Sequence, residues 1–240
     1  MDIYELIGFI IGDGNIYYNK NSGVYRLELC GNVEEDYDYF KQIQDFLIEN
    51  TNKKPAIFVR NEKKGKSLRI QFNNKEFVER LIDLGLVYGK KTFSASLPQE
   101  FINNDKIMFA ILRGLFESDG CLYFSKSKIG LYPTYPRLEI KSSSPRLVNQ
   151  IKLFLESSGF NFYVKKSQSD STYSIVLSGN LMLKKWSEKV GFVSLKNISK
   201  YNIWKSKGFY TPNTPLNERL KICGDGTAAT AVDIFKINSL

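Results

Sequence analysis

At 240 residues the chain is long enough for one large domain or for two subdomains of about a hundred residues each. Its 34 lysines and arginines outnumber its 25 acidic residues, and the net charge of +9 favours a polyanionic partner, although an ordinary basic soluble protein shares this balance. The chain has no histidine, which excludes Ser-His and Cys-His nucleophiles and histidine metal sites. Carboxylates, lysines, hydroxyls and water must therefore carry any chemistry.

The sequence also bears on cellular location. Cys30, Cys121 and Cys223 are dispersed, which argues against a disulfide framework or a thiolate zinc site and indicates a reducing environment. The N-terminus lacks a signal-peptide pattern, and every apolar stretch is broken by charge well short of about 18 residues. We therefore expect an intracellular protein, in the cytoplasm, the nucleoid or a host organelle, with no membrane partner.

The first half of the chain predicts one helix followed by two hairpins, each with its own helix. Residues 3–12 carry apolar side chains at helical spacing, and Asp2 can cap this helix. Alternating apolar and polar residues around turn sequences predict the strands, and apolar residues at helical period predict the helices. In chain order these elements are strands 15–20 and 24–30, helix 34–49, strands 56–61 and 67–72, and helix 74–84.

The second half repeats this order. Arg26-Leu-Glu-Leu29 matches Arg137-Leu-Glu-Ile140, and the length differences between the halves fall in loops, as duplicated folds tolerate. The repeated elements are helix 107–118, strands 121–126 and 135–141, helix 145–157, strands 161–166 and 172–178, and helix 180–190, with a further helix at 196–207. We divide the chain into an N-terminal unit at 1–95, a linker at 96–106, a C-terminal unit at 107–207 and a tail without assigned role at 208–240.

The first helix of each half ends in a similar nonamer, Leu6-Ile-Gly-Phe-Ile-Ile-Gly-Asp-Gly14 and Leu112-Arg-Gly-Leu-Phe-Glu-Ser-Asp-Gly120. Two small residues lie four apart in each, and so on one helix face, which lets another helix approach closely. The closing glycines predict left-handed helix ends. Either Asp-Gly alone would be only a turn signal, but the matched pair predicts that Asp13 and Asp119 meet where the helices end and share a cation such as Mg²⁺.

These paired nonamers resemble the signature of LAGLIDADG homing endonucleases, in particular the monomeric branch with two motifs in one chain, over roughly residues 4–205. The resemblance implies an α+β fold of two pseudo-symmetric αββαββα subdomains, joined by the signature helices, with saddle-shaped antiparallel sheets that lie in the DNA major groove. It also implies that Asp13 and Asp119 are catalytic and bind two or three Mg²⁺ ions at the seam between the subdomains. The backbone carbonyls of Gly12 and Ser118 would complete the metal site.

The family also places lysines near the scissile phosphates. Lys90 and Lys91 follow the third helix of the first half, and Lys196 occupies the matching place in the second half. An exposed loop lysine is the alternative interpretation of each. A second basic or amide position usual in the family falls near Asn32 and Ser143, and neither of these residues is cationic.

Glu117 is the sixth residue of the second nonamer and matches an aspartate of the family consensus, whereas Ile11 holds that place in the first copy. Glu117 could assist at the acid pair. We prefer the interpretation that it faces the boundary between the subdomains.

We expect DNA contacts from the outward side chains of both sheets. A mixture of Arg, Glu, Gln, Asn and Ser suits base recognition in the major groove, although a solvated strand face is the alternative for any single residue. In the first half the predicted contacts are Asn15, Tyr17, Asn19, Arg26, Glu28, Ser67, Arg69 and Gln71. In the second half they are Tyr123, Ser125, Arg137, Glu139, Lys141, Tyr163, Lys165 and Ser174.

These features predict a monomeric, site-specific, Mg²⁺-dependent endodeoxyribonuclease. It would make a staggered double-strand break in a long, asymmetric double-stranded DNA target and be encoded by a mobile intron or an intein-like element. Two alternatives remain on the same fold: an RNA-splicing maturase that binds intron RNA, and a non-catalytic DNA-binding regulator. Regulators of this kind tend to lose the acids, and this chain keeps both.

Overall fold

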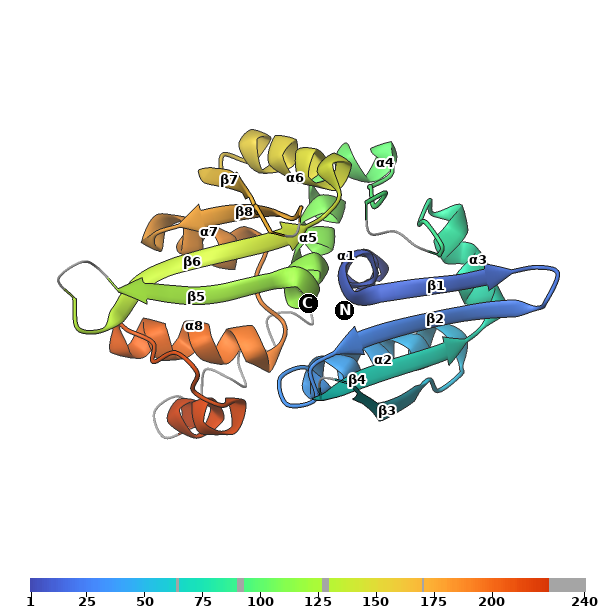
Figure 1. Ribbon diagram of the computed structural model, residues 1–240, viewed down its shortest axis with the longest axis horizontal. Helices are drawn as coiled ribbons and strands as arrows, with labels where there is room; N and C mark the ends of the chain where they lie inside the picture. Colours follow the sequence, from blue (N-terminus) through green and yellow to red (C-terminus); the bar gives the residue numbers. More distant parts are fainter. Residues whose placement is uncertain (64, 90–92, 127–129, 170, 225–240) are drawn as a thin grey trace.

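The computed structural model describes residues 1–224 except 64, 90–92, 127–129 and 170. Two four-stranded antiparallel sheets lie side by side with helices α1 and α5 between them (Figure 1). The first subdomain comprises α1 (Ile3–Asp13), β1 (Gly14–Asn19), β2 (Val24–Gly31), α2 (Tyr37–Thr51), β3 (Ala56–Glu62), β4 (Gly65–Asn73) and α3 (Lys75–Asp83). The second comprises α5 (Asp105–Asp119), β5 (Gly120–Lys126), β6 (Pro133–Ser142), α6 (Pro145–Ser157), β7 (Phe162–Lys166), β8 (Tyr173–Ser178) and α7 (Asn180–Lys189). The α+β class and the two αββαββα units are therefore confirmed.

Further helices lie outside the repeat. The short helix α4 (Gln99–Ile102) interrupts the predicted linker, and α8 (Leu195–Lys207) follows the second subdomain as predicted. Residues 216–224 are also helical, which the sequence did not predict. Among the described residues, no helix combines the length and apolar character that a membrane crossing requires.

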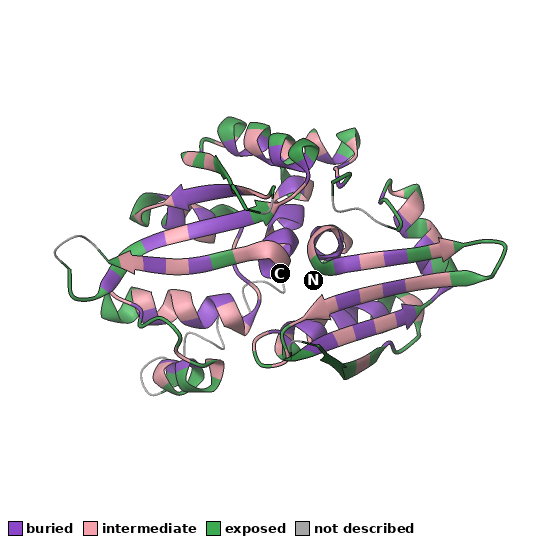
Figure 2. Cartoon of the chain, in the orientation of Figure 1, coloured by how far each residue is buried: buried purple, intermediate pink, exposed green. Residues whose placement is uncertain are grey.

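The strand order is β1-β2-β4-β3 in one sheet and β5-β6-β8-β7 in the other, so corresponding strands occupy corresponding places. Leu27 lies opposite Phe72 across the β2–β4 pair, and both are buried. The next pair, Glu28 and Gln71, lies on the other face and is partly exposed. Figure 2 shows this alternation as bands along the strands. Each sheet therefore packs one face against its helices and leaves the other available to a partner.

Side-chain caps fix where several helices begin. Asp2 Oδ1 accepts a hydrogen bond from the backbone N–H of Glu5 at 2.9 Å, which confirms the predicted cap. Asn74, Asn104 and Ser194 accept in the same way from the residue three positions ahead. Each of these bonds satisfies one N–H group that the first helical turn would leave unpaired.

Helices α1 and α5 pack backbone to backbone. A Cβ atom added to Gly8 would lie 2.0 Å from the carbonyl oxygen of Ile111, and one added to Gly114 would lie 1.8 Å from the carbonyl oxygen of Glu5. Only glycine permits this approach, because any side chain would overlap the opposing main chain. The buried apolar residues of both helices belong to one core that runs through both subdomains. The face of each helix that carries the two predicted small residues is thus where the subdomains join.

The glycines that close the two nonamers act differently from the prediction. Gly14 has φ −103° and Gly120 has φ −92°, so the prediction of left-handed helix ends was wrong. Each helix instead runs directly into a strand. A Cβ at Gly14 would lie 2.6 Å from Ile10 Cα, and one at Gly120 would lie 2.4 Å from the carbonyl oxygen of Phe116. Lack of space at the helix–strand junction, rather than backbone conformation, requires glycine there.

The segment after α8 returns to the first subdomain. Arg219 is 1% exposed, and its Nη2 donates to both carboxylate oxygens of Glu35. Its Nη1 donates to the carbonyl oxygen of Lys196 at 2.6 Å and to the hydroxyl of Ser199 at 3.1 Å. Arg219 therefore fastens the last described helix to α8 and to the N-terminal subdomain.

The seam can be tested by substituting its glycines. Gly114→Ala should lower the free energy of unfolding by about 1–3 kcal/mol and the melting temperature by several degrees, because the new methyl group overlaps the Glu5 carbonyl. Gly224→Ala is the control, since no atom of the described part of the chain lies within 4 Å of a Cβ there. Thermal and urea unfolding measure both variants. Equal stability of Gly114→Ala and wild type would contradict the packing described.

Candidate active site

The two predicted acids end the two joint helices. Asp13 is the last residue of α1 and Asp119 the last of α5. A Cβ placed on Gly12 would lie 2.0 Å from the hydroxyl oxygen of Ser118 and 3.0 Å from Oδ2 of Asp119. The Asp119 carboxylate therefore lies over the backbone beside Asp13. The structure brings together all four residues for which we predicted metal ligation.

A pocket of about 250 Å³ opens in front of Asp119. Gly12 and Ser143 line it, and Lys141 provides a cation. Sequence reasoning placed Lys141 among the DNA contacts and found no cation at Ser143. The signal was nevertheless present, because Lys141 lies at the end of β6, only two residues before Ser143, which follows that strand. Asn32, the matching position in the first half, instead accepts backbone N–H bonds within its own turn.

Lys196 supplies the cation on the Asp13 side. Its Nζ donates to Asp36 Oδ1 at 2.8 Å and to the carbonyl oxygen of Glu117 at 2.9 Å, near the end of α5. Burial by itself would lower the pKa of Lys196, but the charges of Asp36 and Glu117 outweigh it and hold the pKa above its ordinary value, with Asp13 contributing. Lys196 is therefore a fixed positive charge within electrostatic reach of Asp13. It is not an exposed loop lysine.

Glu117 has a structural role. It is 1% exposed and accepts hydrogen bonds from the backbone N–H of Val193 at 2.9 Å, from Asn197 Nδ2 at 2.8 Å and from the Ser194 hydroxyl. These partners lie in the same half of the chain and at the start of α8. Glu117 thus anchors α8, and its charge also helps to raise the pKa of Tyr39 in the first subdomain, so it lies near the boundary between the subdomains.

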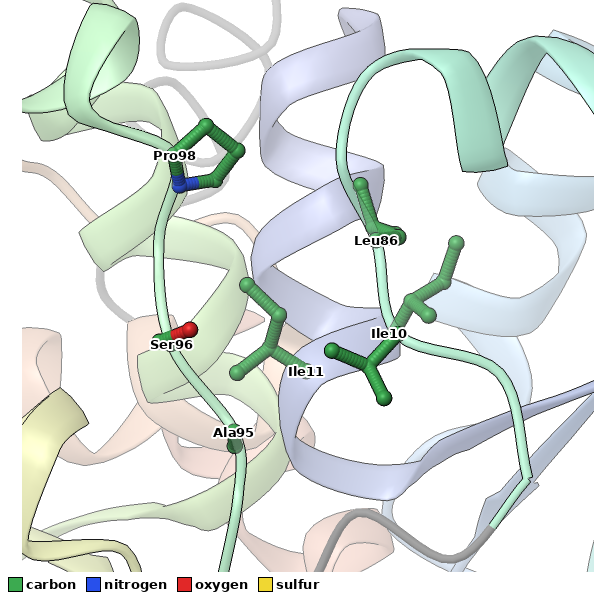
Figure 3. Close-up of a pocket in the computed structure, with 7 residues that line it drawn as sticks. Ile10, Ile11, Leu86, Ala95, Ser96 and Pro98 are labelled. Atoms are coloured by element: carbon green, nitrogen blue, oxygen red, sulfur yellow. The ribbon is translucent and has the colours of Figure 1, made fainter.

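The other side of the seam is apolar. Ile11 holds the place in α1 that Glu117 holds in α5, and it lines a pocket between α1 and the connection to α5 (Figure 3). The other labelled lining residues are Ile10, Leu86, Ala95, Ser96 and Pro98. The two sides of the acid pair are therefore built differently.

The exposed face of the first sheet carries most of the predicted DNA contacts in register. Strand pairing places Asn15 opposite Glu28, and Glu28 opposite Gln71. Tyr17 lies opposite Arg26 in the adjacent row. Asn19 lies at the turn, where its side chain accepts backbone N–H bonds from residues 21 and 22.

Arg69 is held rigidly on this face. Its Nη1 lies 3.3 Å from Glu28 Oε1, its Nη2 lies 2.7 Å from Glu62 Oε1, and its Nε donates to the Ser67 hydroxyl at 3.0 Å. The hydrogen bond from Arg69 is the main cause that lowers the pKa of Glu62. The guanidinium plane is thus oriented before any partner arrives, which favours bidentate contacts.

In the second sheet Arg137 plays a similar part. It donates to the hydroxyls of Ser125 at 3.2 Å, Tyr163 at 3.2 Å and Ser178 at 3.3 Å. Tyr123 lies opposite Arg137. A polar cluster therefore occupies the exposed face of this sheet as well.

Three predicted contact residues lie on the outward face but are nearly buried, and their role as DNA contacts stays a prediction. Ser67 is 9% exposed, Glu139 8% and Ser174 5%. Burial raises the pKa of Glu139, but hydrogen bonding from Ser174 and the charges of Lys165 and Lys141 outweigh it, so the pKa is lowered overall. Its distance to Lys165 Nζ is 3.5 Å. Ser67 holds Arg69 and Glu62, and Ser174 holds Glu139.

The predicted lysines Lys90 and Lys91 lie outside the described residues, so their role stays a prediction.

The metal site can be judged on its donors. Among the described residues no three His, Cys, Asp or Glu side chains form a metal-binding group, and the residues beside Asp13 and Asp119 are Gly12 and Ser118, whose backbone carbonyls the family resemblance implies as ligands. Carboxylate and carbonyl oxygens suit hard divalent cations such as Mg²⁺. The donor set at the seam therefore fits the implied ion.

Sequence comparison agrees with this geometry. Residues 106–204 match the family model of the LAGLIDADG-like domain. The replication factor C small subunit of Methanocaldococcus jannaschii is 28% identical over 205 residues, which are 80% of this chain and 11% of that protein. An uncharacterized protein of the same organism is 28% identical over 163 residues, which are 66% of this chain and 55% of that protein. This chain thus spans about half or less of the length of these relatives.

Solved structures share the fold. Mesophilic variants of the homing endonuclease I-DmoI superpose with a TM-score of 0.53 and 21% identity, over 79% of this chain and 95% of theirs. The homing endonuclease I-WcaI bound to its DNA recognition sequence gives 0.55 and 17%, over 79% and 81%. The N-terminal LAGLIDADG domain of WhiA gives 0.50 and 15%, over 80% and 81%. Other I-DmoI structures hold DNA with Mn, Mg or Ca. Residues 106–204 of this protein are therefore similar to the LAGLIDADG-like domain, and about four fifths of the chain has the fold of the LAGLIDADG homing endonucleases.

Proposed function

We propose that this protein is a site-specific DNA endonuclease that uses Mg²⁺ or a similar divalent cation to cut both strands of a long, asymmetric duplex at staggered positions. The observation that carries the proposal is the placement of Asp13 and Asp119 at the ends of two helices held in backbone contact, between two sheets with polar exposed faces. It acts as a monomer, because one chain supplies both acids and both sheets. We place it inside the cell, where its DNA substrate lies.

The chemistry follows from the residues at the seam. A divalent cation bound by Asp13, Asp119 and the carbonyls of Gly12 and Ser118 would neutralise the scissile phosphate and activate water. Lys196, fixed on the Asp13 side, attracts the phosphate charge. Lys141 offers a second cation in the Asp119 pocket. Because the chain has no histidine, a carboxylate, a lysine, a hydroxyl or water must accept the proton that the attacking water loses.

The proposed asymmetry of the target rests on differences between matched positions of the two sheets. The row Arg26–Asn73 in the first sheet corresponds to Arg137–Ser178 in the second. One half therefore presents an amide where the other presents a hydroxyl, and the two faces favour different bases in the major groove.

We also propose that a mobile intron or an intein-like element encodes the protein. The match to 11% of a replication factor subunit supports this, because an inserted element would align with only a small part of a host protein. A maturase would bind intron RNA and leave DNA uncut, and a regulator would bind DNA without cutting. The experiments below distinguish these outcomes.

The acid pair is tested by Asp13→Asn and Asp119→Asn. Each should slow double-strand cutting by at least about 10²-fold, because a carboxylate ligand of the metal is lost, while affinity for the duplex changes little. Cleavage is measured on DNA that spans an uninterrupted insertion locus, with Asp45→Asn on exposed α2 as the control. Full cutting by either seam variant would refute the assignment of the acids.

Metal dependence is tested on the wild type. Cutting should occur with Mg²⁺ or Mn²⁺ and stop in EDTA, while binding to the duplex persists. Cutting that continues in EDTA would exclude the metal site. Tight binding to intron RNA without cleavage of any locus DNA would favour a maturase, and duplex binding alone would favour a regulator.

The role of Lys196 is tested by Lys196→Met. This variant should lose about 3 kcal/mol of stability at pH 7, since Asp36 is left buried without its partner. The folded pKa of Lys196 lies above 10.5, so its contribution is complete below pH 10.5 and disappears as the pH rises through the folded pKa. In urea unfolding, the difference in the free energy of unfolding between wild type and variant should therefore be constant at neutral pH and become smaller above pH 10.5. A difference that stays constant up to the highest pH would contradict this role of the Lys196 charge. The control is Lys207→Met, at an exposed position at the end of α8.

A further inference from the structure

A second pocket, of about 410 Å³, lies at the edge of the second sheet, between β5, α8 and residues 210–214. β5 is an edge strand, and its first residue, Gly120, directly follows Asp119. Tyr123 lines the pocket and also belongs to the predicted DNA face. The pocket is therefore continuous with that face and close to the acid pair. Its charged and hydroxyl lining residues are Lys200, Arg219, Glu35, Tyr123, Tyr210 and Thr214.

Lys200 is a half-buried amine without a counter-ion. In the part of the chain that the structure describes, its Nζ makes neither an ion pair nor a hydrogen bond. Burial is the main cause that lowers the pKa of Lys200. Arg219 and Lys196 add to this effect, while Cys121 and Glu35 oppose it. A charged amine in this position is unfavourable unless an anion accompanies it.

The neighbouring groups do not supply that anion. The Glu35 carboxylate is taken up by Arg219 Nη2, so these two charges balance each other and the Lys200 charge remains. The Nε of Arg219 is buried and has no hydrogen-bond partner among the described residues. Burial raises the pKa of Tyr210, which keeps its hydroxyl protonated. The pocket thus has an excess of positive charge and tyrosine hydroxyls that can donate, while the Thr214 hydroxyl already donates to the carbonyl oxygen of Thr211 at 2.7 Å.

We propose that this pocket binds a phosphate group, and that in the DNA complex the group is a backbone phosphate of the strand that passes along β5. A phosphodiester carries one negative charge and several acceptor oxygens, which match the amine and hydroxyls of the pocket. Because the pocket includes the segment that follows α8, which has no counterpart in the first subdomain, the contact holds the duplex on one side of the cut only. This use of the site rests on the proposed function.

The first experiment tests the pocket without DNA. Melting temperatures are compared in inorganic phosphate and in chloride at equal ionic strength, for wild type, Lys200→Gln and the control Lys106→Gln, which is exposed at the other end of α5. Phosphate at roughly ten times its Kd should raise the melting temperature of wild type and control by about 3–6 °C. The rise should be absent in Lys200→Gln. In chloride, Lys200→Gln should melt at or above the wild-type temperature, because it removes an unbalanced buried charge.

The second experiment uses a duplex of random sequence in EDTA, because a backbone contact does not depend on sequence or on cutting. Lys200→Gln should lower the slope of log affinity against log salt by about 0.9, the value for one lost phosphate contact. Lys106→Gln should leave the slope unchanged.

The combined outcomes separate the two proposals. Equal stabilisation of wild type and Lys200→Gln by phosphate would overturn the pocket, whether or not the protein cuts DNA. A lost phosphate effect with an unchanged salt slope would overturn the DNA contact and leave a site for free phosphate. If Lys200→Gln loses the stabilisation by phosphate and also has the lower salt slope, the pocket is upheld. This holds even if full cutting by Asp119→Asn refutes the assignment of the acids.

Discussion

The contact between the main chains of α1 and α5 is the constraint on which the rest of the structure depends. The helices can meet at this distance only because Gly8 and Gly114 lack side chains, and each glycine lies against a carbonyl of the other helix. This contact fixes how far apart the helix ends lie and therefore where Asp13 and Asp119 stand. It also sets the spacing of the two sheets, whose β1 and β5 begin directly at those ends. One packing requirement thus determines both the acid pair and the separation of the two exposed faces.

Much of this could be predicted from sequence, because the features that specify it are local or repeated. The apolar periods placed the helices, alternation placed the strands, and two matching nonamers identified the joint and its acids. Predictions that depended on three-dimensional packing fared worse. Ser67 and Ser174 alternate with their neighbours as predicted, yet both are nearly buried. Gly14 and Gly120 were correctly marked as special, but their reason is crowding and not a left-handed turn.

The least predictable features are long-range and asymmetric. Lys196 contacts Asp36, and Glu117 holds the start of α8, across 160 and up to 80 residues of sequence. The Glu117 bonds have no counterpart among the described residues of the first half, because Ile11 replaces Glu117 and meets an apolar connection. A repeat in the sequence reveals what the halves share. It says little about the side chains through which they differ, and here those side chains surround the acids.

The bond between Arg219 and Glu35 has a consequence for evolution by recombination of halves. A gene fusion that exchanged the N-terminal subdomain for that of a relative would keep the glycine joint if the nonamer came with it. It would separate Arg219 from its carboxylate unless the relative carried an acidic residue at the same loop. The chain after α8 thus makes the N-terminal and C-terminal subdomains a matched pair, and a chimaera has to inherit the loop and the last helix together.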